Sequence, residues 1–235
     1  MPDNDLVEEQ PEAPQPTWSR AVIIGASLVA VLLLGATIGM LLTRSLTTTP
    51  AALPGAGSVE VGFAQDMSVH HLQAVTMANW ARDHSSDPEV RQLAFDITGI
   101  QTEQVGRMKG WLMIWDQPEQ TTGAYMQWMT DPMAHAHGGQ ANMSPGDGAL
   151  MPGMASTAEL TKMRSLTGKA LDVDFLQLML RHHQGGTSMV QYAQDHSSSS
   201  AVKALTRSIL VSQGSEIDLM TQMLKSRGAA PLPAS

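Results

Sequence analysis

Apolar residues fill one uninterrupted stretch near the beginning of the chain. The segment from Ala21 to Leu42 carries no charge, and Arg20 and Arg44 flank it. At about 1.5 Å of rise per residue, a helix of this length crosses a hydrocarbon layer of about 30 Å. The segment is apolar on every side and about 20 polar residues precede it, which favours an uncleaved anchor over a buried core helix or a cleaved signal peptide. The pattern therefore predicts a transmembrane helix over 21–43.

The rest of the chain divides by composition around this anchor. Residues 1–20 form an acidic tail, 44–59 are a linker rich in Thr, Pro, Ala and Gly, and 60–228 have the pattern of a folded domain. The two flanking arginines give no charge bias. A short tail before the span and a long domain after it favour a single-pass protein of the cell membrane with its C-terminal domain outside the cytoplasm.

An internal repeat organises the domain. Without gaps, residues 63–86 and 175–198 share 11 identical positions of 24, and the similarity continues beyond them. In both copies, apolar residues recur at helical spacing. The four predicted helices cover 60–84, 88–116, 172–196 and 200–227. Two repeated helical hairpins predict an all-α fold, a four-helix bundle preceded by one transmembrane helix.

The repeats occupy 60–116 and 157–228, and a crossover of 117–156 joins them. Asp87 before Pro88 is a typical helix start, and Ser156 with Glu159 forms a capping box. We expect a short helix around 125–129. The crossover can either traverse the bundle or return to the same end. If it traverses the bundle, the first helices of the two copies are antiparallel. The crossover carries a second group of candidate soft-metal ligands, although a plain linker is the alternative: Met133, His135, His137, Met143, Met151 and Met154.

Composition limits the kinds of metal site, partner and enzyme activity that the chain can have. The chain has 17 Met and 8 His but no Cys, which excludes disulfides and thiolate metal sites. The formal charge is −8, without a basic stripe, so nucleic acid is not an expected partner. No Glu is followed three residues later by His, which disfavours di-iron chemistry, and no nucleophile-elbow or phosphate-loop motif occurs. We therefore expect a binding protein and not an enzyme.

Adjacent histidines occur at the same place in both copies, as His70–His71 and His182–His183. Both pairs fall near mid-helix, so they lie at one level of the bundle. Imidazole with thioether favours copper, Cu(I) or Cu(II), among the metals that histidine binds. The methionines at helical spacing from these pairs are Met67, Met77, Met179 and Met189. The alternative is a hydrogen-bonded polar core, in which Gln101, Gln213 and Glu216 either orient the imidazoles or satisfy buried groups.

Several segments together resemble domain-of-unknown-function family 305. They are FAQDMSVHHLQAVTMA (63–78), MPGMAS (151–156), DVDFLQLMLRHHQGGTSMVQYA (172–193) and the Q-x-x-E-I-x-x-M run (213–220). The resemblance implies a ferritin-like four-helix bundle, secreted or membrane-tethered, with some members linked to periplasmic copper binding and tolerance. The metal ligands it implies are Met67, His70, His71, Met77, His84, Met179, His182, His183, Met189 and His196. The chain departs from the signature at Gln73, where Gly is usual, and at Gly186, where Ala is usual.

Two functions remain open at this point. The first is a membrane-anchored extracytoplasmic protein that binds copper for sequestration, tolerance or transfer, with affinity falling below about pH 6.5 as imidazoles take up protons. The second is a non-enzymatic accessory or scaffold subunit of a larger membrane protein complex, with structural histidines. A metalloenzyme has the least support, because no general base or open carboxylate site is evident.

Overall fold

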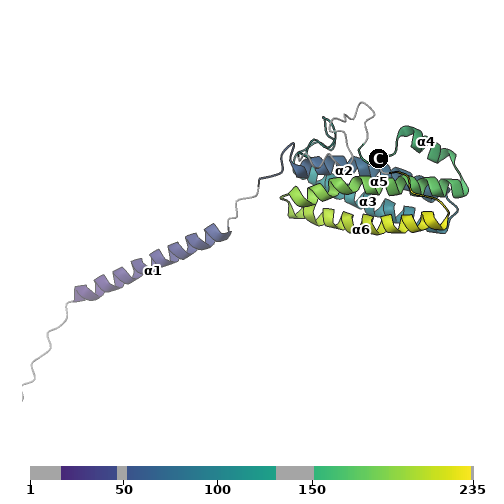
Figure 1. Ribbon diagram of the computed structural model, residues 1–235. Coiled ribbons are helices and arrows are strands. Elements are labelled where there is room, and N and C mark those ends of the chain that lie inside the picture. Colours follow the sequence, from purple (N-terminus) through teal and green to yellow (C-terminus); the bar gives the residue numbers. More distant parts are fainter. Residues whose placement is uncertain (1–16, 47–51, 131–150, 234–235) are drawn as a thin grey trace, which may run out of the picture. The chain divides into compact units, whose positions relative to one another are not determined.

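The computed structural model describes residues 17–46, 52–130 and 151–233, which form six helices and no strand (Figure 1). The chain divides into two compact units at residue 52. The first contains helix α1 and the second contains the bundle.

Helix α1 spans Thr17–Leu46. Its segment Trp18–Arg44 is 27 residues long, with a mean hydropathy of 2.6 and no residue buried, and is long and apolar enough to cross a membrane. The hydroxyls of Thr37 and Thr43 donate to the carbonyl oxygens four residues earlier. These two hydroxyls therefore have acceptors within the helix, as a lipid environment requires.

Four long helices make up the bundle, joined by one short helix. Their bounds are α2 Val59–His84, α3 Pro88–Ile114, α4 Thr157–Ser165, α5 Gly168–His196 and α6 Ser200–Ser226. Helix α2 packs on α3, α5 packs on α6, and α2 and α5 pack against each other (Figure 1). The predicted all-α fold of two helical hairpins is confirmed.

Local capping explains where most of these helices begin. Asp87 accepts hydrogen bonds from the backbone of Glu89 and Val90 with Pro88 in the first turn, and both halves of the Ser156–Glu159 capping box are present. The prediction of a short helix around 125–129 is wrong. Residues 125–128 form turns, because Met126 adopts a positive φ of 63° that a right-handed helix cannot contain.

The two hairpins are related by a pseudo-twofold arrangement. Glu60, at the start of α2, accepts a hydrogen bond of 2.8 Å from the Ser197 hydroxyl just after α5. The repeat-equivalent Asp172, at the start of α5, accepts one of 2.5 Å from the Ser85 hydroxyl just after α2. The start of α2 therefore lies beside the end of α5, and the start of α5 lies beside the end of α2. The two helices are antiparallel.

The apolar core consists of two clusters. One contains Phe175 and Met179 with Met77, and the other contains their repeat equivalents Phe63, Met67 and Met189. On both α2 and α5, the histidine pair falls between a residue of one cluster and a residue of the other. The bundle therefore has a polar centre with an apolar cluster on either side.

Candidate metal centre

The structure brings the two predicted histidine pairs together in this polar centre. His70, His71, His182 and His183 are all 0% exposed. The His70 and His182 rings lie 3.8 Å apart between centroids, with an interplanar angle of 37°. The His182 and His183 centroids are 6.2 Å apart. The convergence of the two halves that the repeat predicted is therefore present.

Backbone carbonyls fix the tautomers of the central pair. His70 Nε2 donates to the carbonyl oxygen of Pro152 at 3.1 Å, and His182 Nε2 donates to the carbonyl oxygen of His70 at 3.1 Å. A carbonyl oxygen can only accept, so the proton of each neutral ring is on Nε2. Nδ1 of each ring then carries a lone pair.

Side chains from α3 and α6 hold the outer pair in the same way. His71 Nε2 lies 2.8 Å from Gln104 Oε1, and His183 Nε2 lies 2.6 Å from Glu216 Oε2. Gln104 and Glu216 are repeat equivalents. Sequence reasoning found Glu216 but missed Gln104, although the repeat offset applied to Glu216 would have identified it.

The four Nδ1 atoms have no partner. Each is buried without a hydrogen bond. Burial lowers the pKa of His70 to about 4 and that of His71 to about 3, and it holds the pKa of His182 well below its ordinary value. These rings are therefore neutral at pH 7, and proton competition with a metal begins at a lower pH than the 6.5 expected for an ordinary imidazole.

Two glutamines add further unsatisfied polar atoms. Both side-chain atoms of Gln101 and Nε2 of its repeat equivalent Gln213 are buried without a partner. Neither side chain hydrogen-bonds a histidine. A buried polar atom without a partner costs free energy, so these atoms mark the inner stripe of α3 and α6 as suited to a polar ligand or water.

The free nitrogens do not yet form a coordination sphere. Among the described residues, no group of three or more His, Asp or Glu side chains is arranged to hold a metal ion. The donor set nevertheless fits a borderline or soft cation, because it consists of neutral, deprotonated imidazole nitrogens with thioethers one turn or more away along the same helices.

The four helical methionines of the predicted ligand set pack in the apolar clusters. Met67, Met77, Met179 and Met189 are each 0% exposed. Packing accounts for their burial, and their role as ligands stays a prediction.

The remaining two predicted ligands lie away from the centre. His84 and His196 are exposed at the C-terminal ends of the antiparallel helices α2 and α5. Each stacks on an aromatic ring four residues earlier, Trp80 at 3.7 Å and Tyr192 at 4.0 Å, and its Nδ1 donates to the carbonyl of that same residue. The structure does not bring either one to the histidine pairs.

The crossover ends in a segment, 151–155, that covers one side of the centre. A Cβ added at Gly153 would lie 2.5 Å from the Arg181 carbonyl and 3.0 Å from Cα of His182. Gln73 holds this segment through both backbone groups of Ala155, at 2.7 and 2.9 Å. The candidate ligands Met133, His135, His137 and Met143 lie outside the described residues, whereas Met151 is buried here.

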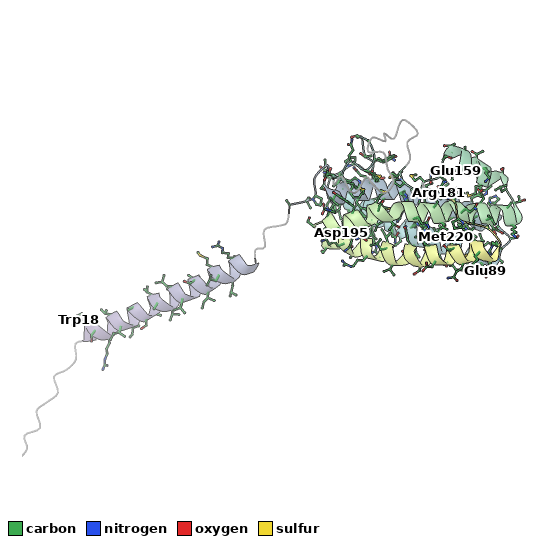
Figure 2. The ribbon with its side chains drawn as sticks, viewed as in Figure 1. Trp18, Glu89, Glu159, Arg181, Asp195 and Met220 are labelled. Carbon is green, nitrogen blue, oxygen red and sulfur yellow. The ribbon has the colours of Figure 1, made fainter. Side chains whose placement is uncertain are left out.

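Both departures from the family signature have a structural role near the histidines. Gln73 is the residue that anchors Ala155. A Cβ at Gly186 would lie 2.9 Å from Cε1 of His70, so glycine leaves room for that ring. Behind the segment, Arg181 on α5 pairs with Glu159 on α4 at 2.7 Å (Figure 2).

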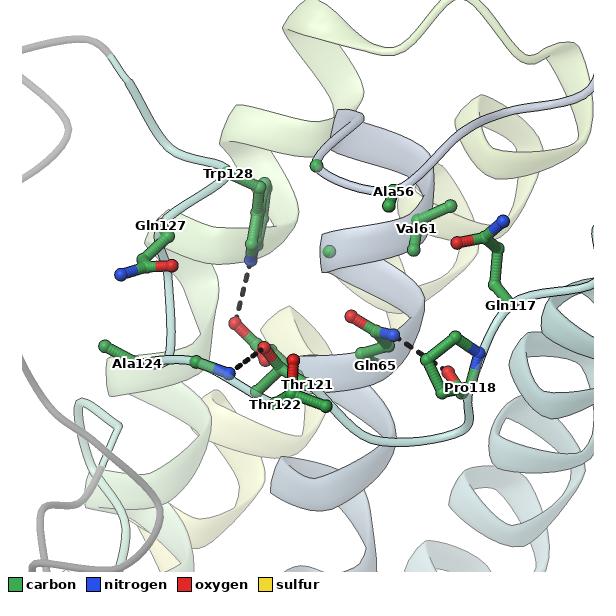
Figure 3. Close-up of a pocket in the computed structure, with 14 residues that line it drawn as sticks. Ala56, Val61, Gln65, Gln117, Pro118, Thr121, Thr122, Ala124, Gln127 and Trp128 are labelled. Carbon is green, nitrogen blue, oxygen red and sulfur yellow. Dashed lines mark hydrogen bonds between the residues drawn. The ribbon is translucent and has the colours of Figure 1, made fainter.

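A separate pocket of about 400 Å³ lies at the start of α2, and no motif in the sequence predicts it (Figure 3). The buried Asp66 carboxylate accepts hydrogen bonds from the Met126 backbone at 2.7 Å and the Trp128 indole at 2.8 Å. Burial raises the pKa of Asp66 to about 6. Asp66 thereby fastens the turns after α3 onto α2.

Comparison with known proteins gives one family. The family model Domain of unknown function (DUF305) matches residues 60–224. A DUF305 protein of Streptomyces coelicolor is 41% identical, with 76% of this chain and 99% of that chain covered and a TM-score of 0.66. A DUF305 fragment from Deinococcus radiodurans is 33% identical, with coverages of 74% and 99% and a TM-score of 0.57.

A more distant neighbour is CopM in its Cu(II)-bound form. It is 23% identical, with 71% of this chain and 96% of that chain covered and a TM-score of 0.53, a likeness of fold. CopM is also known in a Cu(I)-bound form. No curated protein matches the chain.

Proposed function

Because this chain belongs to the DUF305 family, whose model covers most of its bundle, we propose that it is a membrane-anchored, extracytoplasmic copper-binding protein. It binds copper for sequestration, tolerance or transfer, and it needs no catalytic step.

The observation that carries this proposal is the set of four free Nδ1 atoms. In each histidine, Nε2 donates a hydrogen bond to a fixed acceptor, and the buried Nδ1 has no partner. Metal-binding histidines are held in this way, with the outer ring nitrogen donating to a carbonyl or carboxylate. His70, His71, His182 and His183 would hold the ion.

Copper is favoured by the chemistry of the donors and by a structural neighbour. Imidazole nitrogens accept both copper oxidation states, and nearby thioethers favour Cu(I). CopM, which shares the fold, has been captured with each state. The chain contains no thiolate that would favour zinc or an iron–sulfur cluster.

Helix α1 and a relative support the proposed location. The segment Trp18–Arg44 suits a single membrane span, and the Streptomyces coelicolor protein is a candidate secreted protein. We propose that the bundle lies outside the cytoplasm and that α1 is its membrane anchor.

Titration of the full chain in detergent with Cu(II), and with Cu(I) under reducing conditions, tests the proposal. Replacing His70, His71, His182 and His183 by Gln should abolish tight binding, with circular dichroism confirming that the helices persist. The matched control replaces the exposed His84 and His196 by Gln and should bind as the unaltered chain does. Absence of binding in the unaltered chain, or its persistence in the fourfold variant, would contradict the proposal.

A scaffold subunit of a larger membrane complex is the second candidate. One observation favours it: all four buried histidines already have hydrogen-bond partners within the fold, so each can serve structure alone. Mild detergent extraction from native membranes separates the two. The scaffold role requires a stoichiometric protein partner and a chain that carries no copper.

A further inference from the structure

The polar centre is closed on three sides in the described part of the bundle. The two apolar clusters close it along the bundle axis, and they include the fully buried Phe63 and Phe175. The segment 151–155 closes it on the outer side of α2 and α5, where the backbone of Gly185 meets that of Gly153. An ion that reaches the histidines has to pass one of these covers or use the remaining side.

The remaining side is the seam between α3 and α6. These helices pack on α2 and α5 respectively, but they are not a closely packed pair. A groove of about 750 Å³ lies between them, lined from α3 by Asp96, Gly99 and Glu103 and from α6 by three serines. Apolar side chains form part of its wall, among them Phe95, which is 61% exposed.

The same groove reaches the two residues that hold the outer histidines. Gln104 and Glu216 both line it, and they contact Nε2 of His71 and His183 at 2.8 and 2.6 Å. The Glu216 side chain is 12% exposed, whereas that of His183 is 0% exposed. One side chain therefore separates solvent in the groove from a buried imidazole.

We infer that the groove between α3 and α6 is the path by which a cation enters and leaves the histidine centre, with Glu216 at its inner end. This inference rests on the proposed function and adds the route to it. No Lys or Arg lines the groove, and its charged residues are Asp96, Glu103 and Glu216. A cleft of one charge sign with apolar walls concentrates ions of the opposite sign. Glu103 is in part neutralised by Arg107, so Asp96 and Glu216 supply most of the field.

Gly99 provides the test, because it faces the groove and a Cβ placed there has nothing within 4 Å. A Gly99→Phe substitution places an aromatic ring at the wall of the groove, and its Cβ meets no neighbouring atom. Gly106, on the same helix, is equally open and exposed but does not line the groove. Gly106→Phe is therefore the matched control for helix content and added apolar surface.

The measurement is stopped-flow mixing of the full chain in detergent with Cu(II), followed by tryptophan fluorescence, and release to a chelator. In Gly99→Phe, association and dissociation should both slow by about tenfold, as expected when access requires a rearrangement. The equilibrium affinity should stay unchanged, because a blocked path affects both directions equally. Gly106→Phe should match the unaltered chain to within about twofold in both rates.

Three results would overturn the inference while leaving the proposed function intact. The first is unchanged rates in Gly99→Phe, and the second is the same slowing in both variants. Loss of affinity in Gly99→Phe with unchanged association would also contradict a path. If the unaltered chain binds no copper at all, the proposed function itself fails, and equilibrium titration shows this before any rate is measured.

Discussion

At the scale of single residues, Glu216 and Gln104 occupy equivalent positions but differ by one charge. Each accepts a hydrogen bond from Nε2 of a buried histidine, yet only Glu216 can balance the charge of a cation bound on the far side of the ring. The two halves of the centre are therefore geometrically alike and electrically different.

A Glu216→Gln substitution makes the second half match the first. Partners of this kind typically contribute about 10- to 100-fold to metal affinity, and we expect a loss of that size for Cu(II) and a smaller one for Cu(I). Titration with both ions measures it. Gln104→Glu is the reciprocal variant and should strengthen Cu(II) binding. Equal losses for both ions would indicate that only the hydrogen bond matters.

Asp66 is a residue whose charge is disfavoured by its burial. Its pKa is raised to about 6 by burial, so at pH 7 the fold holds a carboxylate in a place that disfavours it. An Asp66→Asn side chain keeps an oxygen for the Met126 and Trp128 donors without that charge. We expect stabilisation at pH 7 of up to about 3 kcal/mol, measured by urea unfolding. Asp66→Ala, which removes the acceptor as well, should destabilise the domain.

At the scale of elements, the contact between α5 and the crossover depends on backbone approach. A Cβ at Gly185 would meet the backbone of Pro152 and Gly153, which cannot move aside as a side chain can. Gly185→Ala should therefore destabilise the bundle by roughly 1–3 kcal/mol despite the better helix propensity of alanine.

Gly214 in α6 is the comparison for this substitution. Nothing lies within 4 Å of a Cβ placed there, so Gly214→Ala should stabilise the domain by about 0.5–1 kcal/mol. Thermal unfolding of both variants checks the pair. Stabilisation of the same size at Gly185 would show that the cover over the centre is loose.

Elements were predictable from sequence where local pattern decides them. Apolar spacing and caps such as Asp87–Pro88 predicted the long helices, and the repeat predicted that His70 and His182 would meet. The turns at 125–128 were not predictable, because the carboxylate that accepts the Met126 hydrogen bond belongs to Asp66, 60 positions away. The clamp of Gln73 on Ala155 spans 82 positions and was missed for the same reason.

At the scale of the whole molecule, the buried histidines make stability depend on pH. The pKa of His70 and of His71 is lowered from 6.5 to about 4 and about 3, and that of His182 is lowered as well. The unfolded chain takes up protons on these rings near pH 6.5 while the folded chain does not. The metal-free domain should therefore lose stability as pH falls from about 6.5 towards 4, by about 1.4 kcal/mol per pH unit for each such ring.

Asp66 acts in the opposite direction over part of this window. Its pKa is raised from 3.8 to about 6, so it binds a proton in the fold before it does in the unfolded chain, and it adds stability as pH falls between these values. Three histidines outweigh one carboxyl, and the net trend remains a loss. Urea unfolding at a series of pH values measures it, and Asp66→Asn should steepen the loss. A flat profile would show that the rings are not held neutral.

The histidine centre takes two of its rings from each hairpin, and both hairpins belong to one polypeptide. A lone hairpin carries only His70 and His71 or only His182 and His183, and it could gather all four rings only by meeting a second hairpin in solution. Joining both in one polypeptide makes that meeting intramolecular, which raises the effective concentration of one hairpin at the other. The centre therefore persists on dilution, even where few copies of the protein are present.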